Sequence, residues 1–125
     1  MLLKMDERIK KLRKLLEQLN DGWIFVEGKR DREALRLLGL QKILTISGNL
    51  RQSCAKIQKD EKVFVLTDLD RRGEQLARMA KDELEGLSIT VDLEMRKNLA
   101  YILNIRYFED AKRAYDDLLI RSKTE

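Results

Sequence analysis

The stretch Val63–Glu74, VFVLTDLDRRGE, decides how this chain folds. Its first four residues are all apolar, which predicts a short strand buried on both faces, as strands of a parallel sheet are. Asp68 and Asp70 follow this strand directly, and a helical pattern begins near Gly73. Open α/β sheets bind their ligands at the carboxyl ends of their strands. Carboxylates two residues apart are good oxygen ligands for Mg²⁺ or Mn²⁺, so the stretch predicts a metal site at one edge of a sheet.

Strand and helix patterns alternate on both sides of this stretch. Further strands are expected at Trp23–Val26, at Lys42–Ile46 and, half-buried, at Ile89–Leu93, and helical patterns separate them. This alternation predicts an α/β fold, a three-layer α/β/α sandwich with right-handed crossovers and a four-stranded parallel sheet. We expect the single domain 1–125 to consist of a core at 21–93, an N-terminal amphipathic helix at 1–20 and C-terminal helices at 94–125.

Composition narrows the chemistry that is open to the protein. The 125 residues include no His and a single Cys, which excludes Ser–His pairs, His metal ligands and an internal disulfide. The formal net charge of +4 permits a polyanionic partner. No apolar run approaches the ~20 residues that span a bilayer, and the start lacks the pattern of a secretory signal. We therefore expect a cytoplasmic protein without membrane contact.

Several residues outside the strands have simple structural interpretations. The N-terminal helix carries an apolar seam at heptad spacing, which predicts packing on the domain, on a twin subunit or on a partner protein. Cys54 lies on the apolar face of a helix and is expected in the core. Asp31 is a candidate N-cap. Three tyrosines lie beyond the expected core, in helical patterns, and are expected to be packing residues, namely Tyr101, Tyr107 and Tyr115.

A third carboxylate, Glu27, follows the first strand directly. We predict the strand order 2-1-3-4, in which Glu27 meets Asp68 and Asp70 in one crevice, at the point where the strand order reverses. Three carboxylates repel one another unless a divalent cation or basic side chains lie among them. Four basic residues flank the acidic turns and are candidates to bind phosphate: Lys29, Arg30, Arg71 and Arg72. The alternative is that the aspartates only cap the next helix and that Glu27 pairs with an arginine.

Two motifs together resemble a known family. Val26–Asp31, VEGKRD, followed later by Thr67–Glu74, TDLDRRGE, is similar to the signature of the Toprim domain. This domain occurs in topoisomerases, bacterial primases, recombination mediators and the ribonuclease that matures 5S ribosomal RNA. The likeness covers residues 21–93 and is greatest to the small standalone Toprim proteins of archaea and bacteria.

The resemblance implies roles for particular residues. It makes Glu27 the general acid or base and Asp68 and Asp70 the Mg²⁺ ligands. Gly28 and Gly73 would form turns of the site. Ser47, Gly48 and Asn49 would form the small-residue turn that lies beside the site after the second strand.

The sequence leaves the reaction open. A DxD motif also occurs in haloacid-dehalogenase-type phosphatases, but there it follows the first strand, and here it follows the third. The topoisomerases add a nucleophilic tyrosine from a separate domain that this chain lacks. The leading hypothesis is a small Mg²⁺-dependent nuclease or nuclease subunit. The alternative is a non-catalytic, metal-stabilised module that binds nucleic acid or a protein through its basic N-terminal helix. DNA and RNA are not distinguished.

Overall fold

The four strands form one parallel sheet in the order β2-β1-β3-β4, as the sequence predicts. The computed structural model describes residues 4–47, 50–58 and 60–124. The strands are β1 Trp23–Val26, β2 Ile43–Thr45, β3 Lys62–Val65 and β4 Thr90–Asp92. β1 and β3 are the central pair, with Phe25 opposite Val65. The strand order therefore reverses between β1 and β3, and the chains that leave these two strands are neighbours.

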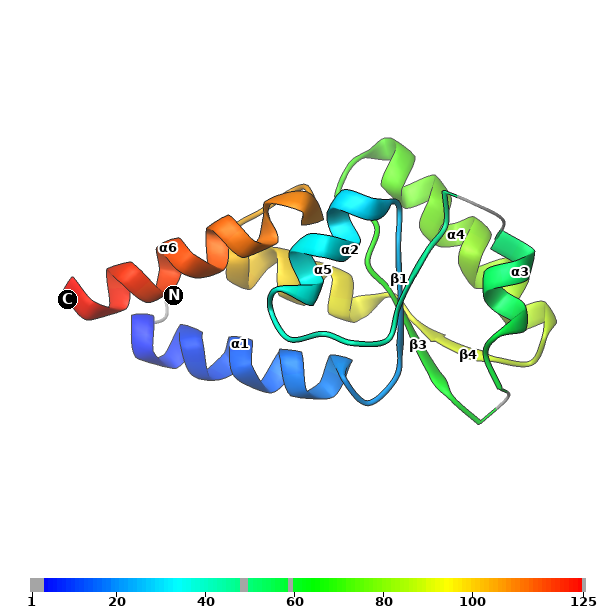
Figure 1. The fold of residues 1–125 in the computed structure, drawn as a ribbon, viewed down its shortest axis with the longest axis horizontal. Helices are drawn as coiled ribbons and strands as arrows, with labels where there is room; N and C mark the ends of the chain where they lie inside the picture. Colours follow the sequence, from blue (N-terminus) through cyan, green and yellow to red (C-terminus); the bar gives the residue numbers. More distant parts are fainter. Residues whose placement is uncertain (1–3, 48–49, 59, 125) are drawn as a thin grey trace.

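Helices cover both faces of the sheet and complete the predicted three layers (Figure 1). One layer contains α3 Leu50–Ala55 and α4 Arg71–Gly86. The other contains α1 Met5–Leu19, α2 Lys29–Arg36, α5 Glu94–Leu103, a short 3₁₀ turn η1 Phe108–Asp110 and α6 Ala111–Thr124. In Figure 1 the first turn of α1 and the last turn of α6 lie at the same end of the molecule, and the two helices are in contact.

The apolar runs of β1 and β3 are buried on both faces because alternate residues enter two separate cores. Ile24 and Phe64 join the core under α1, α2, α5 and α6. Phe25 and Val65 join the core under α3 and α4. Cys54 is fully buried in this second core, which confirms its predicted place.

The N-terminal helix packs on its own domain. Ile9, Leu12 and Leu19 of the predicted seam are buried, and the helix lies against α5 and α6. The apolar seam is therefore used within the chain. Among the helices in the described ranges, none is long and apolar enough to cross a bilayer.

Local predictions are wrong at three residues. Asp31 is not an N-cap: the helix cap is Gly28, and Asp31 lies in the first turn, where its side chain accepts a hydrogen bond from the Gly28 amide at 3.0 Å. Tyr101 is not a packing residue, since 73% of it is exposed. Tyr107 is also exposed, whereas Tyr115 packs against the core as expected. Gly48 and Asn49 lie outside the described residues.

Candidate functional site

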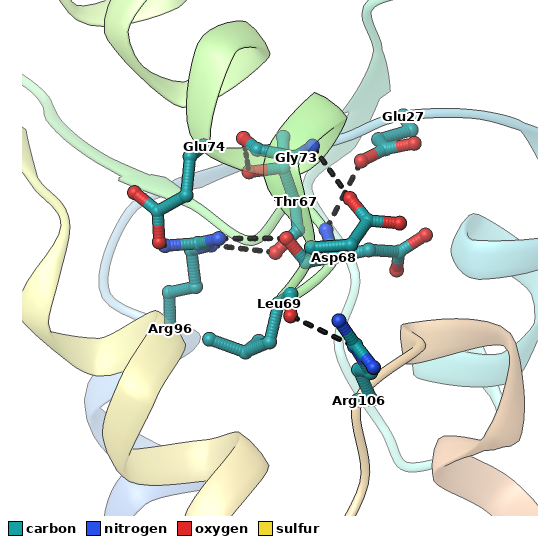
Figure 2. A network of polar contacts seen from close by, with 9 residues as sticks. Glu27, Thr67, Asp68, Leu69, Gly73, Glu74, Arg96 and Arg106 are labelled. Carbon is teal, nitrogen blue, oxygen red and sulfur yellow. Dashed lines mark hydrogen bonds and ion pairs between the residues drawn. The ribbon is translucent and has the colours of Figure 1, made fainter.

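The two acidic turns meet at the carboxyl edge of the central strands. The Asp68 amide donates a hydrogen bond to Glu27 Oε1 at 3.1 Å, which joins the chain after β3 to the chain after β1 (Figure 2). The negative charges of Asp68 and Asp70 both act on the Glu27 carboxylate. The three predicted acids therefore lie in one neighbourhood, which the strand order makes possible.

Each of the three carboxylates binds a backbone amide through one oxygen. Asp70 is the N-cap of α4 and accepts from the Gly73 amide at 2.7 Å. Asp68 accepts from the Phe108 amide at 2.9 Å and so anchors η1. Asp70 thus has the capping role that was its alternative interpretation, whereas Asp68 ties the loop to a different part of the chain. A carboxylate has two oxygens, so these contacts leave acceptor capacity on each acid.

Burial and neighbouring acids raise the pKa values of Glu27 and Asp68. Burial raises the pKa of Glu27 most, and the charges of Asp68, Asp31 and Asp70 raise it further, against the hydrogen bond from the Asp68 amide. Burial also raises the pKa of Asp68, with Asp70 and Glu109 adding to it. A cation bound here would relieve this repulsion.

Asp31 belongs to the same cluster. Only 7% of it is exposed, and burial raises its pKa to about 6. The charges of Asp68 and Glu109 contribute to this same rise, while hydrogen bonds from the Gly28 and Glu109 amides oppose it. The site is thus a cluster of five acids, two more than the strand ends supply.

Arg96 holds the acidic loop from behind. It is 1% exposed, and its guanidinium donates to the carbonyl oxygens of Thr67 and Asp68, both at 2.6 Å, and to Glu74 Oε1 at 2.9 Å. Figure 2 shows this guanidinium on the opposite side of the loop from Glu27. Because Arg is always charged and presents a rigid fork of donors, it fixes two successive carbonyls at once.

The segment after α5 binds the other side of the loop. The Leu69 amide donates to the Arg106 carbonyl at 2.8 Å, and Arg106 Nε donates to the Leu69 carbonyl at 3.1 Å. Together with the Phe108–Asp68 bond, this pair connects the loop 67–70 to residues far along the chain. The orientation of the aspartates is therefore set by tertiary contacts.

Comparison with known proteins identifies relatives over most of the length. The chain is 38% identical to the UPF0292 protein of Pyrococcus furiosus over 121 residues, which cover 92% of each chain. It is 41% identical to a Pyrococcus abyssi UPF0292 protein over 99 residues, covering 76% of this chain and 75% of that one. The chain belongs to the UPF0292 family.

A solved structure supports the fold of this UPF0292 protein. A putative protein from Aquifex aeolicus superposes with a TM-score of 0.68 and 28% identity, covering 87% of this chain and 99% of that one. No protein-family model matches the chain.

The four predicted phosphate-binding residues lie at two helix starts in this UPF0292 protein. Lys29 and Arg30 are the first residues of α2, and Arg71 and Arg72 are the first residues of α4. All four are exposed. Arg30 reaches Glu109 at 4.0 Å, but the Arg30 side chain is 90% exposed and the contact is weak. Helix N-termini favour anions, so these positions suit phosphate oxygens.

The carboxylate oxygens of the cluster suit a hydrated divalent cation such as Mg²⁺. Within the described residues, no group of three or more acidic, His or Cys side chains is arranged to enclose a metal ion. Mg²⁺ seldom needs such a cage, because it keeps several waters and binds one or two carboxylates together with substrate phosphates. Carboxylates with a spare oxygen, beside exposed Arg and Lys, fit that mode of binding.

Sequence reasoning missed Arg96, Arg106 and Glu109 as parts of the site. Arg96 offered one signal: it stands at helical spacing with the buried Leu99 and Leu103, on an otherwise apolar face. A charged residue there needs buried partners. For Arg106 and Glu109 the sequence carries no comparable signal, since only the packing of η1 brings them to the loop.

Proposed function

We propose that this UPF0292 protein is a Toprim-type, Mg²⁺-dependent phosphoryl-transfer protein acting on nucleic acid, as a small nuclease or nuclease subunit. The observation that carries the proposal is the junction of the two acidic turns through the Asp68–Glu27 hydrogen bond. It unites the VEGKRD and TDLDRRGE motifs, on which the Toprim resemblance rests, in one acidic cluster with exposed basic residues at its rim.

Each residue has a proposed task. Asp68 and Asp70 would hold Mg²⁺ or Mn²⁺, which would polarise the scissile phosphate and stabilise the charge that develops on it. Glu27 would transfer a proton or complete the metal shell, and a raised pKa suits a group that exchanges protons near neutral pH. The basic residues at the starts of α2 and α4 would orient the phosphates. We place this activity in the cytoplasm, as the sequence suggests.

The second candidate is a non-catalytic binding module. The observation in its favour is that Glu27, Asp68 and Asp70 each accept a hydrogen bond from a backbone amide, as purely structural carboxylates do. In that case the acids would organise the loop, and binding would follow the basic surfaces.

A cleavage assay separates the two candidates. Labelled single-stranded, duplex and hairpin RNAs and DNAs are incubated with the protein in Mg²⁺, Mn²⁺ or EDTA. The nuclease proposal expects product only with metal. Glu27→Gln should lower the rate by about 10²–10⁴, the usual contribution of a general acid or base. Glu33→Gln, the same change at an exposed acid paired with Arg36 on α2, should leave the rate unchanged.

Calorimetric titration with Mn²⁺ tests the metal ligands in the same preparations. Asp68→Asn and Asp70→Asn keep an oxygen for the Phe108 and Gly73 amides, so both variants should fold, and both should bind the ion much more weakly. Unchanged Mn²⁺ affinity in both variants would reduce the aspartates to structural caps. An absence of metal-dependent product from the wild type on every substrate would favour the binding module.

A further inference from the structure

Two pockets whose linings contain no carboxylate lie in the helical layer formed by α1 and α5, beside the acidic loop 67–70. One pocket of about 460 Å³ lies between α1, α5 and the segment after α5, and Arg8, Leu69, Lys97 and Tyr101 are among the residues that line it. A second pocket of about 380 Å³ continues it along α1 and α5, and Lys11 and Lys14 are part of its lining. Tyr101 and Ile102 line both pockets, which are therefore neighbours, and we call these two pockets the groove. A third pocket, of about 300 Å³, shares Arg8, Asn104 and Ile105 with the first, but it lies outside the groove and has Asp110 and Asp117 in its lining.

The charge of this groove is one-sided. Four cations line it and no carboxylate does, although the chain has 22 acidic residues for 26 basic ones. Within the described residues, Arg8, Lys11, Lys14 and Lys97 take part in no ion pair. Arg8 is also held in place, since its Nε donates to the Ile102 carbonyl at 2.7 Å. The groove therefore offers cations to a polyanion.

The groove also offers an aromatic face. Tyr101 lines both pockets and is 73% exposed, which is unusual for so large a side chain on a helix that buries most of its length. Exposed aromatic rings between cations are what proteins use to stack the bases of single strands. In a duplex the bases are already stacked on one another, and their faces are not accessible to such a ring.

The groove reaches the loop of the proposed site. Leu69, between Asp68 and Asp70, lines its first pocket. In Figure 2 the Leu69 side chain extends away from Glu27, toward the helix of Arg96. The loop therefore presents acids on one side and contributes to the groove wall on the other. A chain lying in the groove contacts the element that carries the aspartates.

We infer that this groove binds single-stranded nucleic acid, with a base stacked on Tyr101 and phosphates on Arg8, Lys11, Lys14 and Lys97. The inference rests on the proposed function and narrows its substrate to strands that are single-stranded beside the acidic site.

The test is fluorescence anisotropy of a labelled oligothymidylate and of a matched duplex, in EDTA, so that neither metal nor turnover enters. The full chain should prefer the single strand. Tyr101→Ala should weaken binding roughly fivefold to a hundredfold, the range for one base–aromatic stack, and Tyr101→Phe should restore it. The double variant Lys11→Gln with Lys14→Gln should make the plot of log binding constant against log salt concentration less steep. Its slope should fall by about 1.4, since each single-strand phosphate contact contributes about 0.7.

Lys56→Gln provides the charge control, because Lys56 is exposed at the end of α3 in the opposite layer. It should change affinity and slope by much less than half of the change seen in the double variant of Lys11 and Lys14. Unchanged affinity in Tyr101→Ala, or equal affinity for duplex, would overturn the inference. So would a wild type that sediments as a dimer and becomes monomeric on Tyr101→Ala, since the groove would then hold a second copy.

The two proposals fail separately. If Tyr101→Ala weakens oligonucleotide binding but the wild type shows no metal-dependent cleavage, the groove inference is supported and the nuclease proposal is wrong. If cleavage depends on Asp68 and Asp70 while Tyr101→Ala binds single strands normally, the reverse holds.

Discussion

Gly73 is where the start of α4 lies against the acidic loop. A Cβ placed on it would be 1.8 Å from the Asp68 carbonyl oxygen and 2.6 Å from the carbonyl carbon. The same glycine donates its amide to Asp70, and its own carbonyl accepts from the buried Thr67 hydroxyl at 2.6 Å. The need for glycine comes from this close approach of two backbones, and it fixes how far Asp68 stands from α4.

Gly73→Ala should therefore be costly. The obstructing atoms are backbone, and the Asp68 carbonyl is also held by Arg96, so neither can give way without moving the loop. We expect a loss of roughly 1–3 kcal/mol in the free energy of unfolding, as for other overpacked sites, and weaker Mn²⁺ binding. Urea denaturation followed by Trp23 fluorescence measures the first, and calorimetry the second.

Gly86→Ala is the matched control for this prediction. Gly86 is in the same helix, nothing lies within 4 Å of its added Cβ, and the change should be neutral or stabilising by up to about 1 kcal/mol. A Gly73→Ala variant as stable as Gly86→Ala would show that the loop adapts freely.

At the scale of elements, α5 and the turn after it support the site. The sequence predicts an α/β core at 21–93 followed by C-terminal helices at 94–125. In the structure Arg96 of α5, Arg106 and Phe108 all bind the loop 67–70. The C-terminal helices therefore position the aspartates as well as covering the sheet.

Removing the Arg96 fork should disrupt this support. Arg96→Met keeps the bulk but leaves the Thr67 and Asp68 carbonyls without their donor. The Thr67 bond is buried and the Asp68 bond is part-buried. A buried acceptor left unpaired costs about 1–3 kcal/mol, so we expect a loss of at least that size, measured by urea denaturation. Arg96→Lys should recover only part of it, because one ammonium cannot reproduce the fork.

Glu74→Gln is the comparison that isolates the carbonyls. The Glu74 side chain is 48% exposed, so removing its charge should cost less than about 1 kcal/mol. If Arg96→Met and Glu74→Gln destabilise equally, the salt bridge and not the carbonyl clamp is what Arg96 contributes.

At the scale of the whole molecule, the sequence predicted what local patterns determine. The apolar runs of β1 and β3 predicted a buried sheet. A single acidic site after both strands predicted that the two strands are neighbours, and the observed order confirms this. The acids at the strand ends could be found for the same reason. Contacts that depend on how α5 and η1 pack, such as those of Arg96 and Glu109, cannot be predicted from the spacing of apolar residues along the chain.

Tyr101 was missed for a different reason. It lies two positions after the buried Leu99, about 200° around a helix of 3.6 residues per turn, so spacing alone placed it on the outer face. The prediction that Tyr101 packs is wrong because its position on the helix determines its exposure. Where residue type and helical position disagree, an exposed aromatic is informative about function.

The acidic cluster as a whole predicts a coupling between stability, pH and metal. Unfolded Asp and Glu release their protons near ordinary values of 3.8 and 4.5, while folded Asp31 keeps its proton until about pH 6 and Glu27 is shifted upward. Between about pH 4 and 6 the folded state thus binds more protons than the unfolded state, and the cluster's contribution to stability falls as pH rises. Below that range both states are protonated and the contribution is constant.

Lowered pKa values at Glu33, Glu61 and Glu74 act with the opposite sign, so the test compares wild type with Asp31→Asn. The variant keeps an oxygen for the Gly28 amide but loses the charge. Its stability relative to wild type, from urea midpoints, should rise from pH 4 to pH 7. Equal pH profiles for the two proteins would contradict the shift at Asp31.

Mg²⁺ should stabilise the folded state by binding the ionised acids of the cluster. A cation that binds only the folded state stabilises it by RT ln(1 + [Mg²⁺]/Kd), about 2.7 kcal/mol at a concentration of 100 Kd. Because the acids must be ionised to bind it, the rise in Tm with Mg²⁺ should be larger at pH 7.5 than at pH 5, and absent in Asp68→Asn combined with Asp70→Asn. NaCl at equal ionic strength is the control, since screening alone also relieves repulsion. A rise in Tm that is the same with NaCl, or that persists in the double variant, would show that dissolved salt screens the acidic charges and that no specific ion binds.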